Sequence, residues 1–226
     1  MSARDQAGEI GPQANGLAAS LALRTQALHR RAERSGIVQD ILRGQVSRDA
    51  YALYLRNLLP AYQAMEDGLR ALRLAPGVRE IAFPGLFRSD AILHDLGSLG
   101  GRDWAASLPL LAEGAGYAAR VADAAGDGAR LIGHAYTRQL GDLSGEPMLA
   151  RSLTRTLGLD AEAMAFFAFP DVADPARLRD EYRAGLDRAG LELAPDGVID
   201  EALAAFGCNI VLSDAIQREA GMRVGR

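Results

Sequence analysis

The chain has 226 residues, 49% of them hydrophobic, which is enough for a core that buries about 70% of the unfolded surface. Its net charge of −4 argues against nucleic acid as the main partner, and no run of 18 apolar residues predicts a membrane-spanning helix. The single cysteine, Cys208, excludes an internal disulfide and a cysteine-based metal cluster, which fits a reducing compartment.

The two ends of the chain are expected to lie outside the folded part. Residues 1–16 are polar, contain glycine and lack the apolar stretch of a secretory signal, so they predict a flexible tail on a cytoplasmic protein. Residues 221–226 are expected to form a short C-terminal tail. One helical domain then occupies residues 17–220.

Apolar residues recur at intervals of three and four along almost the whole chain, which is typical of amphipathic helices. A first helix is expected from Leu17 to just before Gly36, and a second from the N-cap Ser47 to about Leu74. Pro60 is expected to bend the second helix, because proline removes a backbone donor from the helix interior.

Six further helices are expected in the rest of the chain. Gly100 and Gly101 end the first of them and Pro195 opens the last. No segment of five residues alternates in the way of a β-strand. The sequence therefore predicts an all-α single domain, with these helices at about 85–97, 105–124, 127–157, 160–168, 174–190 and 195–220.

The segment LHRRAE at 28–33 places His29 and Glu33 four residues apart, on one face of the first helix. A carboxylate there can accept the spare N–H of an imidazole, which strengthens the imidazole as a ligand to iron. The same spacing is typical of an ordinary surface pair, so spacing alone does not decide between the two. His134 is expected to pack between helices or lie at the surface rather than to bind metal.

The segment GHAYTRQLGDLSGEP at 133–147 combines apolar residues at helical intervals with Gly141 and Gly145. Each glycine in a helix costs about 1 kcal/mol relative to alanine, so its presence needs a reason. Two interpretations remain open. The glycines form a bare strip against which a flat ligand lies, with Asp142 beside it, or they allow two helices to pack closely.

Four blocks of the sequence, taken together, resemble the heme oxygenase family of the biliverdin-producing, bacterial type. They are HRRAE at 29–33, HAYTRQLGDLSG at 134–145, FFAFP at 166–170 and EYR at 181–183, in matching order and at matching separations. The resemblance extends over about residues 20–215. It implies a helical bundle in which heme lies between a proximal helix and a kinked distal helix.

The resemblance also implies roles for individual residues around the heme iron. His29 is the expected proximal ligand, with Glu33 as its neighbour on the helix. The distal residues are expected to be Gly141 and Gly145, which let the helix bend across the heme, and Asp142, which organises water in a network with Arg138, Tyr62 and Asn209.

A second implied group lies around the porphyrin and its propionates. Ala22 stands where the family often has a basic propionate contact, which leaves more of that task to two arginines of the EYR region. The residues expected in this group are Tyr136, Ser144, Arg179, Arg183 and Phe206. Guanidinium groups suit the task because they bind carboxylates in a bidentate manner.

The implied reaction is oxidative opening of heme to biliverdin, carbon monoxide and ferrous iron. Heme b is then both substrate and cofactor, and O2 is the second reactant. Electrons come from a separate donor such as a ferredoxin, a flavodoxin or a reductase, because the chain has no flavin, nicotinamide or iron–sulfur motif. A bilin-binding photoreceptor is a candidate user of the biliverdin.

The chain departs from the family at Glu146 and Pro147, where the family continues Gly-Gly-Gln. Either Glu146 crowds the distal pocket, or it faces outward while Pro147 sets the kink by removing the N–H that would bond Leu143. A heme carrier or sensor with weak or altered degradation activity is therefore an alternative. Related helical proteins bind two irons or hydrolyse thiamine, but this sequence lacks their patterns of carboxylates or reactive cysteine.

Overall fold

The computed structural model describes residues 16–224, except for the side chains of residues 145–147, 223 and 224. Within these residues every regular element is helical, as the sequence predicts. The α-helices are α1 (Leu17–Ala32), α2 (Gly36–Arg43), α3 (Arg48–Ala71), α4 (Ser89–Gly100), α5 (Trp104–Ser107), α6 (Ala112–Ala124), α7 (Gly128–Ala135), α8 (Gly141–Leu157), α9 (Pro175–Ala189) and α10 (Pro195–Val224). Short helical segments are η2 (Val78–Glu80), η3 (Pro84–Leu86), η4 (Tyr136–Leu140), η5 (Ala161–Ala163) and η6 (Ala165–Phe167).

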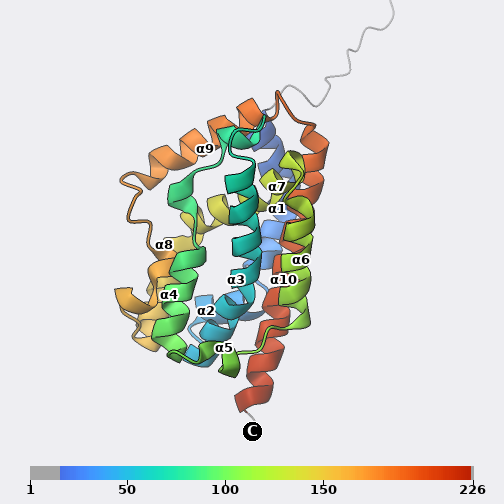
Figure 1. Cartoon of the computed structure of the whole chain (residues 1–226). Helices are drawn as coiled ribbons and strands as arrows, with labels where there is room; N and C mark the ends of the chain where they lie inside the picture. Colours follow the sequence, from blue (N-terminus) through green and yellow to red (C-terminus); the bar gives the residue numbers. More distant parts are fainter. Residues whose placement is uncertain (1–15, 225–226) are drawn as a thin grey trace, which may run out of the picture.

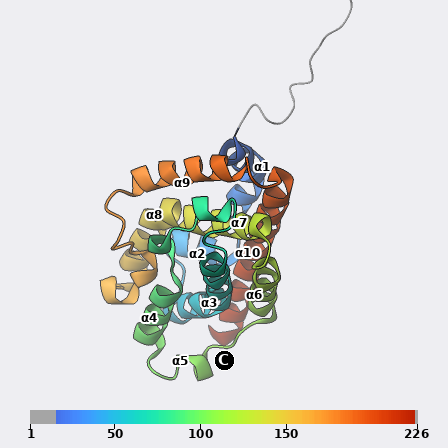
Figure 2. The ribbon, with the colours of Figure 1, turned by 45° about the horizontal axis from the view of Figure 1, so that its top comes forward.

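The bundle is built around α3, which packs against α4, α6, α7 and α10. The long α10 also contacts α1, α2 and α7, so it ties both ends of the chain to the centre (Figure 1). The helix α9 crosses one end of the bundle, as both views show (Figure 2). Across residues 16–224, no helix combines the length and the apolar character needed to cross a bilayer.

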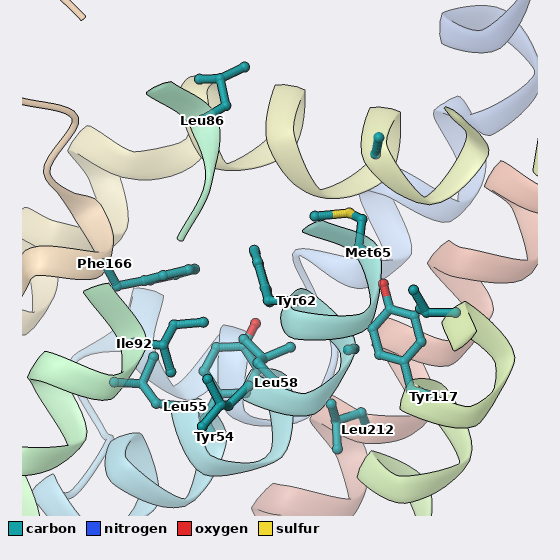
Figure 3. Close-up of a cluster of buried hydrophobic side chains, with 14 of the residues drawn as sticks. Tyr54, Leu55, Leu58, Tyr62, Met65, Leu86, Ile92, Tyr117, Phe166 and Leu212 are labelled. Carbon is teal, nitrogen blue, oxygen red and sulfur yellow. The ribbon is translucent and has the colours of Figure 1, made fainter. Parts of the chain in front are cut away.

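The helix α3 begins as predicted, because the Ser47 hydroxyl accepts a hydrogen bond from the backbone N–H of Ala50. Pro60 lies inside α3, which continues through it to Ala71. Figure 3 shows side chains of α3, including Tyr54 and Tyr62, among aliphatic and aromatic residues from several other elements. The core therefore holds aromatic rings with hydroxyl groups that need partners.

The expected helix at 105–124 is wrong, because residues 108–111 separate α5 from α6. Pro109 cannot donate a backbone hydrogen bond to such a helix. Asn57, which is buried in α3, forms hydrogen bonds with the backbone of this loop. Its amide nitrogen donates to the Pro109 carbonyl at 3.1 Å, and its amide oxygen accepts from the Leu111 N–H at 2.7 Å. A side chain distant in sequence thus stabilises the break.

Other differences concern short elements and helix ends. The structure has a separate helix α2 that the sequence did not predict, and 3₁₀ turns η5 and η6 in place of a helix at 160–168. The helix α4 starts at Ser89 rather than near residue 85. The helix α10 continues through Val224, into the expected C-terminal tail. Residues 1–15 of the expected N-terminal tail lie outside the described residues.

The long helix expected at 127–157 is present, and it changes its winding in the middle. Asp127 caps its start by accepting the N–H groups of Ala129 and Arg130. Between α7 and α8 it adopts a π-helical turn, η4. A π turn inserts an extra residue and often occurs at functional sites. In this chain it directly precedes Gly141.

Candidate active site

A narrow cleft of about 110 Å³ lies where α1, the α7–α8 helix, α9 and α10 meet. Six residues that the sequence assigned to the site line it: His29, Tyr136, Gly141, Ser144, Arg183 and Phe206. Thr137 and Leu140 complete the wall and were not predicted. Thr137 directly follows Tyr136, and Leu140 lies four residues after it in the same helix. Helical spacing from Tyr136 could therefore have identified Leu140 as a lining residue.

His29 projects into the cleft from α1, with 52% of its side chain exposed. The Phe206 ring lies edge-on to the imidazole, with 5.8 Å between ring centroids. The Glu33 carboxylate faces Nδ1 of His29, with 3.6 Å between Oε1 and Nδ1. This contact orients the ring from one side and directs Nε2 away from Glu33, which is the arrangement of an imidazole ligand and its carboxylate neighbour.

Gly141 forms the bare part of the opposite wall. A methyl group built at Gly141 meets no atom of the described residues within 4 Å, apart from the backbone of its own helix, so none of the described helices packs against it and close helix packing is wrong as its explanation. Gly133, two turns earlier, is the contrasting case, since a methyl group there lies 2.7 Å from the Val198 carbonyl oxygen. The space at Gly141 belongs to the cleft, so the bare backbone there is open to a ligand in the cleft. The side chains at 145–147 lie outside the described residues.

Four predicted residues form one hydrogen-bonded network on the adjoining face of the same helix. Tyr62 Oη donates to Asp142 Oδ2 at 2.5 Å and accepts from Arg138 Nε at 2.7 Å. Arg138 also donates to Asp142 Oδ1 at 3.1 Å and to Asn209 Oδ1 at 2.6 Å. Because a guanidinium only donates, the Tyr62 proton is directed at Asp142.

Burial and nearby charges shift the pKa values of these residues in opposite directions. Burial raises the pKa of Asp142, while the Arg138 charge and the Tyr62 hydrogen bond lower it, with a net rise. Burial also raises the pKa of Tyr62 well above its usual value. For Arg138 burial works against the charge, but attraction to Asp142 and nearby tyrosines leaves its pKa well above the usual value. Arg138 therefore stays charged and Tyr62 stays protonated.

Two further tyrosines adjoin the network and were missed by sequence reasoning. The Tyr117 hydroxyl lies 3.4 Å from the Asn209 amide nitrogen, which donates to it. Tyr54 is buried close enough for the charges of Arg138 and Asp142 to act on its pKa, which burial raises. Tyr54 is eight residues before Tyr62 on α3, and this helical spacing is the signal that could have found it.

The FFAFP block contacts the network by packing Phe166 against Tyr62. The ring of Phe166 packs edge-on against the ring of Tyr62, with centroids 5.7 Å apart. The buried Asp95 carboxylate of α4 accepts the backbone N–H groups of Ala165 and Phe166, at 2.7 and 2.9 Å. Asp95 thus fixes the turn that holds Phe166 against Tyr62.

The two arginines of α9 have different surroundings. Arg183 lines the cleft and pairs with Asp180 at 3.0 Å. Arg179 donates from Nη1 to the Leu143 carbonyl at 3.4 Å and does not line the cleft. Pro147 has no N–H to bond that carbonyl, and α8 nonetheless continues through residue 147. Arg179 therefore donates a hydrogen bond to the Leu143 carbonyl, which has no helical partner because Pro147 lacks an N–H.

Tyr136 is held from the α1 side of the cleft. Its hydroxyl lies 3.3 Å from the buried Thr25 hydroxyl, which donates to or accepts from it. Thr25 stands four residues before His29, on the same face of α1. The sequence analysis did not include Thr25, although its spacing from His29 was a usable signal. This contact joins α1 to the distal helix behind the cleft.

His134 is fully buried, so its expected role in helix packing is confirmed. Its Nε2 lies 2.9 Å from Glu201 Oε1, and Glu201 also accepts hydrogen bonds from Arg120 and Arg130. Since a carboxylate only accepts, Nε2 carries the proton, and Nδ1 is buried without a partner among the described residues. Burial lowers the pKa of His134 from 6.5 to about 4.

The lowered pKa predicts a loss of stability in acid. Above pH 6.5 His134 is neutral in both the folded and the unfolded chain; as the pH falls toward 4, only the unfolded chain takes up the proton. We expect the free energy of unfolding to fall by about 3 kcal/mol from this residue over that window. Urea unfolding of wild type and His134→Gln between pH 7 and 4 measures it. A difference between the two proteins that does not change with pH would contradict it.

The comparisons with known proteins agree with this geometry. The sequence matches the family described as heme oxygenase over residues 15–215. It is 33% identical over 204 residues to heme oxygenase 1 of Nostoc sp., covering 89% of this chain and 86% of the relative. It is 35% identical over 198 residues to the heme oxygenase of Takifugu rubripes, covering 86% of this chain and 72% of the relative.

A solved structure gives the same result. The crystal structure of heme oxygenase-1 from the cyanobacterium Synechocystis sp., in complex with heme, matches with a TM-score of 0.85 at 29% identity. The match covers 93% of this chain and 96% of that chain. Sequence and fold thus agree over nearly the whole length. The chain belongs to the heme oxygenase family.

Proposed function

We propose that this chain opens the heme ring oxidatively, with O2 and external electrons, in the cleft between His29 and Gly141. The products are biliverdin, carbon monoxide and ferrous iron. Membership of the family supports heme degradation. The observation that supports this location is the open space at Gly141, opposite a half-exposed histidine with a carboxylate at its Nδ1. Bound heme supplies the iron that binds O2 and the ring that is oxidised.

His29 binds the iron through Nε2, and Glu33 keeps the ring oriented by its contact with Nδ1. Arg183 and Tyr136 line the cleft and are placed to bind the heme carboxylates, while Phe206 packs against the imidazole. Arg179 serves mainly to hold the distal helix through the Leu143 carbonyl. The propionate contacts therefore depend on Arg183 more than on Arg179.

Asp142 supplies protons by holding water beside the bare backbone of Gly141. Its two oxygens are fixed by Tyr62 and Arg138, so the carboxylate is held in one orientation, and its remaining lone pairs would accept water. Asn209 fixes the other side of Arg138. The glycine matters because it offers no side chain that would compete with this water.

The volume of the cleft, about 110 Å³, is smaller than that of a porphyrin ring, so ring binding requires α1 and α8 to move apart. The π-helical turn η4 ends next to Gly141 and supplies a place where the distal helix can adjust its winding. The direct ties between α1 and the distal helix at this point include the hydrogen bond between Thr25 and Tyr136, at 3.3 Å.

The reaction needs a separate one-electron donor, and we place it in the cytoplasm, where low-potential electron carriers are kept reduced. A ferredoxin, a flavodoxin or a flavin reductase meets this need. A bilin-binding photoreceptor is the proposed user of the biliverdin. The presence of one cysteine in the whole chain fits a reducing compartment.

A single-turnover experiment tests the proposed reaction. The purified chain is mixed with hemin, reduced with ascorbate in air and followed by the Soret absorption. We expect the Soret band to decay as biliverdin absorption grows and carbon monoxide is released. A stable oxygen-bound heme spectrum without biliverdin would instead identify a heme carrier or sensor.

Replacing Gly141 with alanine separates folding from function. The added methyl group meets no atom of a neighbouring helix among the described residues, and alanine is a better helix former, so we expect stability to rise by up to about 1 kcal/mol. The methyl group stands where the heme should lie, so heme affinity and the rate of ring opening should both fall. Urea unfolding and hemin titration measure the two effects.

Gly133→Ala is the matched control for this substitution. Its methyl group would lie 2.7 Å from the Val198 carbonyl oxygen, so we expect a loss of stability of about 1–3 kcal/mol. A Gly141→Ala protein with wild-type heme affinity and activity would show that the ring does not lie against this wall.

A further inference from the structure

A groove of about 390 Å³ lies against the first half of α9, and we call it the α9 groove. Its walls are η3 with the preceding Phe83, the loop at 171–174, and one face of α9. That face carries Leu178 and Glu181, whereas Arg183 of the heme cleft lies about half a turn further round the helix. The groove is thus separate from the heme cleft, and its volume is typical of pockets for small molecules.

The walls of the α9 groove are fixed by hydrogen bonds within the chain. Arg88 is buried and donates to the carbonyl groups of Gly85, at 3.1 Å, and of Ala168, so it joins η3 to the loop that follows η6. Asp174 caps α9 by accepting two backbone N–H groups, both at 3.0 Å. The groove is therefore formed before a ligand binds, which lowers the cost of binding.

One carboxylate in the groove has a charge that is not balanced nearby. Arg177 Nε and Glu181 Oε1 form an ion pair at 2.8 Å. The charge of Asp174 faces the N-terminus of α9, which is the positive end of the helix dipole. The Asp171 carboxylate makes no hydrogen bond or ion pair with another described residue. This end of the groove therefore favours a cation.

The apolar part of the groove lies inside it rather than on the surface around it. Phe83, Val172 and Leu178 line the groove and are partly buried. Among the described residues, no large hydrophobic side chain is exposed at 81–88 or 166–183. A protein interface needs apolar surface over a wider area. The groove therefore suits a small ligand with one cationic group and a short aliphatic body.

The α9 groove contacts the distal helix through two rings. The ring of Phe83 packs against that of Tyr182, with centroids 5.7 Å apart. Tyr182 is fully buried, and its hydroxyl donates to Gln139 Oε1 at 3.2 Å. Gln139 belongs to η4 and lies two residues before Gly141. A ligand that touches Phe83 is thus connected to the turn that adjusts when heme enters.

We propose that the α9 groove is an effector site, in which a small alkyl guanidinium or ammonium ion binds and restrains the distal helix. The cationic group pairs with Asp171, and the aliphatic body packs on Leu178 and Phe83. The bound ion holds Phe83 against Tyr182, which favours the closed form of η4 and opposes heme entry. Linkage then requires hemin and the ion to weaken each other's binding by the same factor.

The test uses n-butylguanidinium as the probe, because it stays charged and does not bind iron. The matched control ligand is n-butylurea, which has the same shape without the charge. The Kd of each is measured by ¹H–¹⁵N NMR titration of the hemin-free full chain. The variants are Asp171→Asn, Gly85→Leu and the control Asp200→Asn, which alters an exposed carboxylate of α10.

We expect butylguanidinium to bind wild type and Asp200→Asn equally, and Asp171→Asn at least about 5-fold more weakly. Butylurea should bind wild type with the same lowered affinity. A methyl group at Gly85 would contact the side chains of Asp171 and Val172 at 3.8 and 4.0 Å, so Gly85→Leu places its larger side chain in the groove and should lose binding. Far-ultraviolet circular dichroism checks that each variant is folded.

The effect on heme is measured by titrating hemin into the chain at saturating butylguanidinium. We expect the hemin Kd of wild type to rise about 5-fold, and that of Asp171→Asn to stay unchanged. Tyr182→Phe removes the hydrogen bond to Gln139 and keeps the ring against Phe83. This variant should bind butylguanidinium as wild type does and show a smaller rise in the hemin Kd.

Equal affinity of wild type and Asp171→Asn for butylguanidinium would overturn the proposal, as would a hemin Kd that butylguanidinium leaves unchanged. A peptide such as Gly-Leu-Arg-Leu-Gly that binds at least about 10-fold more tightly than butylguanidinium would assign the groove to a partner protein instead. The proposal rests on the proposed position of heme in the cleft and not on ring opening. A wild type that forms no biliverdin would therefore refute the proposed reaction and leave these binding measurements to decide on the α9 groove.

Discussion

Replacing Asp142 with alanine is expected to leave heme binding in place and to slow biliverdin formation by about 100-fold or more, the usual effect of removing a positioned acid–base group. The carboxylate accepts hydrogen bonds from both Tyr62 and Arg138, and no other described acid takes part in these contacts. Without it, the water beside Gly141 loses its anchor. Single-turnover absorption spectra with hemin and ascorbate measure the rate.

The same substitution leaves the Arg138 charge buried without its carboxylate, which costs about 3–5 kcal/mol of stability. Asp142→Asn is therefore the companion variant, because the amide oxygen still accepts one hydrogen bond and keeps the volume. Tyr62→Phe removes the donor to Asp142 and the acceptor of Arg138 Nε but leaves the carboxylate in place, and we expect a smaller loss of rate, about 10-fold. Wild-type rates in both Asp142 variants would contradict the role of this network in proton supply.

His29→Ala is expected to abolish the spectrum of histidine-ligated heme and to lower ring opening to the level of free hemin. The reason is that His29 is the imidazole of the cleft, opposite Gly141. Among residues 16–224 the other two histidines lie elsewhere: His134 is buried against Glu201, and His94 lies on α4 beside Asp95. The Soret maximum and the electron paramagnetic resonance signal of the ferric protein measure the change.

Added imidazole provides the control for His29→Ala. The substitution opens space in the cleft, so free imidazole should enter, bind the iron and restore the histidine-type spectrum and part of the activity. Glu33→Gln keeps the ligand and alters only its partner, and we expect a shifted spectrum with retained binding. A histidine-type spectrum in His29→Ala without added imidazole would assign the ligand to another residue.

The fold could be predicted where local sequence determines it. Ser47 marked a helix start and Gly101 marked an end, and both act as such in the structure. The break at 108–111 was missed because it depends on Asn57, about fifty residues earlier in the sequence. The side chain of Asn57 forms hydrogen bonds with the backbone of this loop. The π turn at 136–140 was missed because the apolar pattern of a π turn resembles that of an α-helix over one turn.

The candidate site followed from the sequence to the extent that its residues share helices. Spacing paired His29 with Glu33, and the family resemblance paired Arg138 with Asp142, four residues later; both pairs are in contact. The family resemblance was needed to bring Tyr62 and Asn209 to the same network, since they belong to other helices. The contact of Arg179 with the Leu143 carbonyl could not be predicted, because it depends on how α9 lies across the distal helix.

The glycines show what the structure adds to the sequence pattern. Gly133 and Gly141 lie in one long helix, and the sequence analysis weighed ligand contact against close helix packing only for Gly141 and Gly145. Contact with the α10 backbone explains Gly133, and open space in a cleft explains Gly141. Only the position of neighbouring helices separates these cases.

The crystal structure of this chain with bound hemin tests the central claim most directly. We predict that the iron is bound by Nε2 of His29, and that the opposite face of the ring lies against the backbone at Gly141, with water held by Asp142. Iron bound by any other residue, or a distal face filled by a side chain such as that of Glu146, would contradict the account.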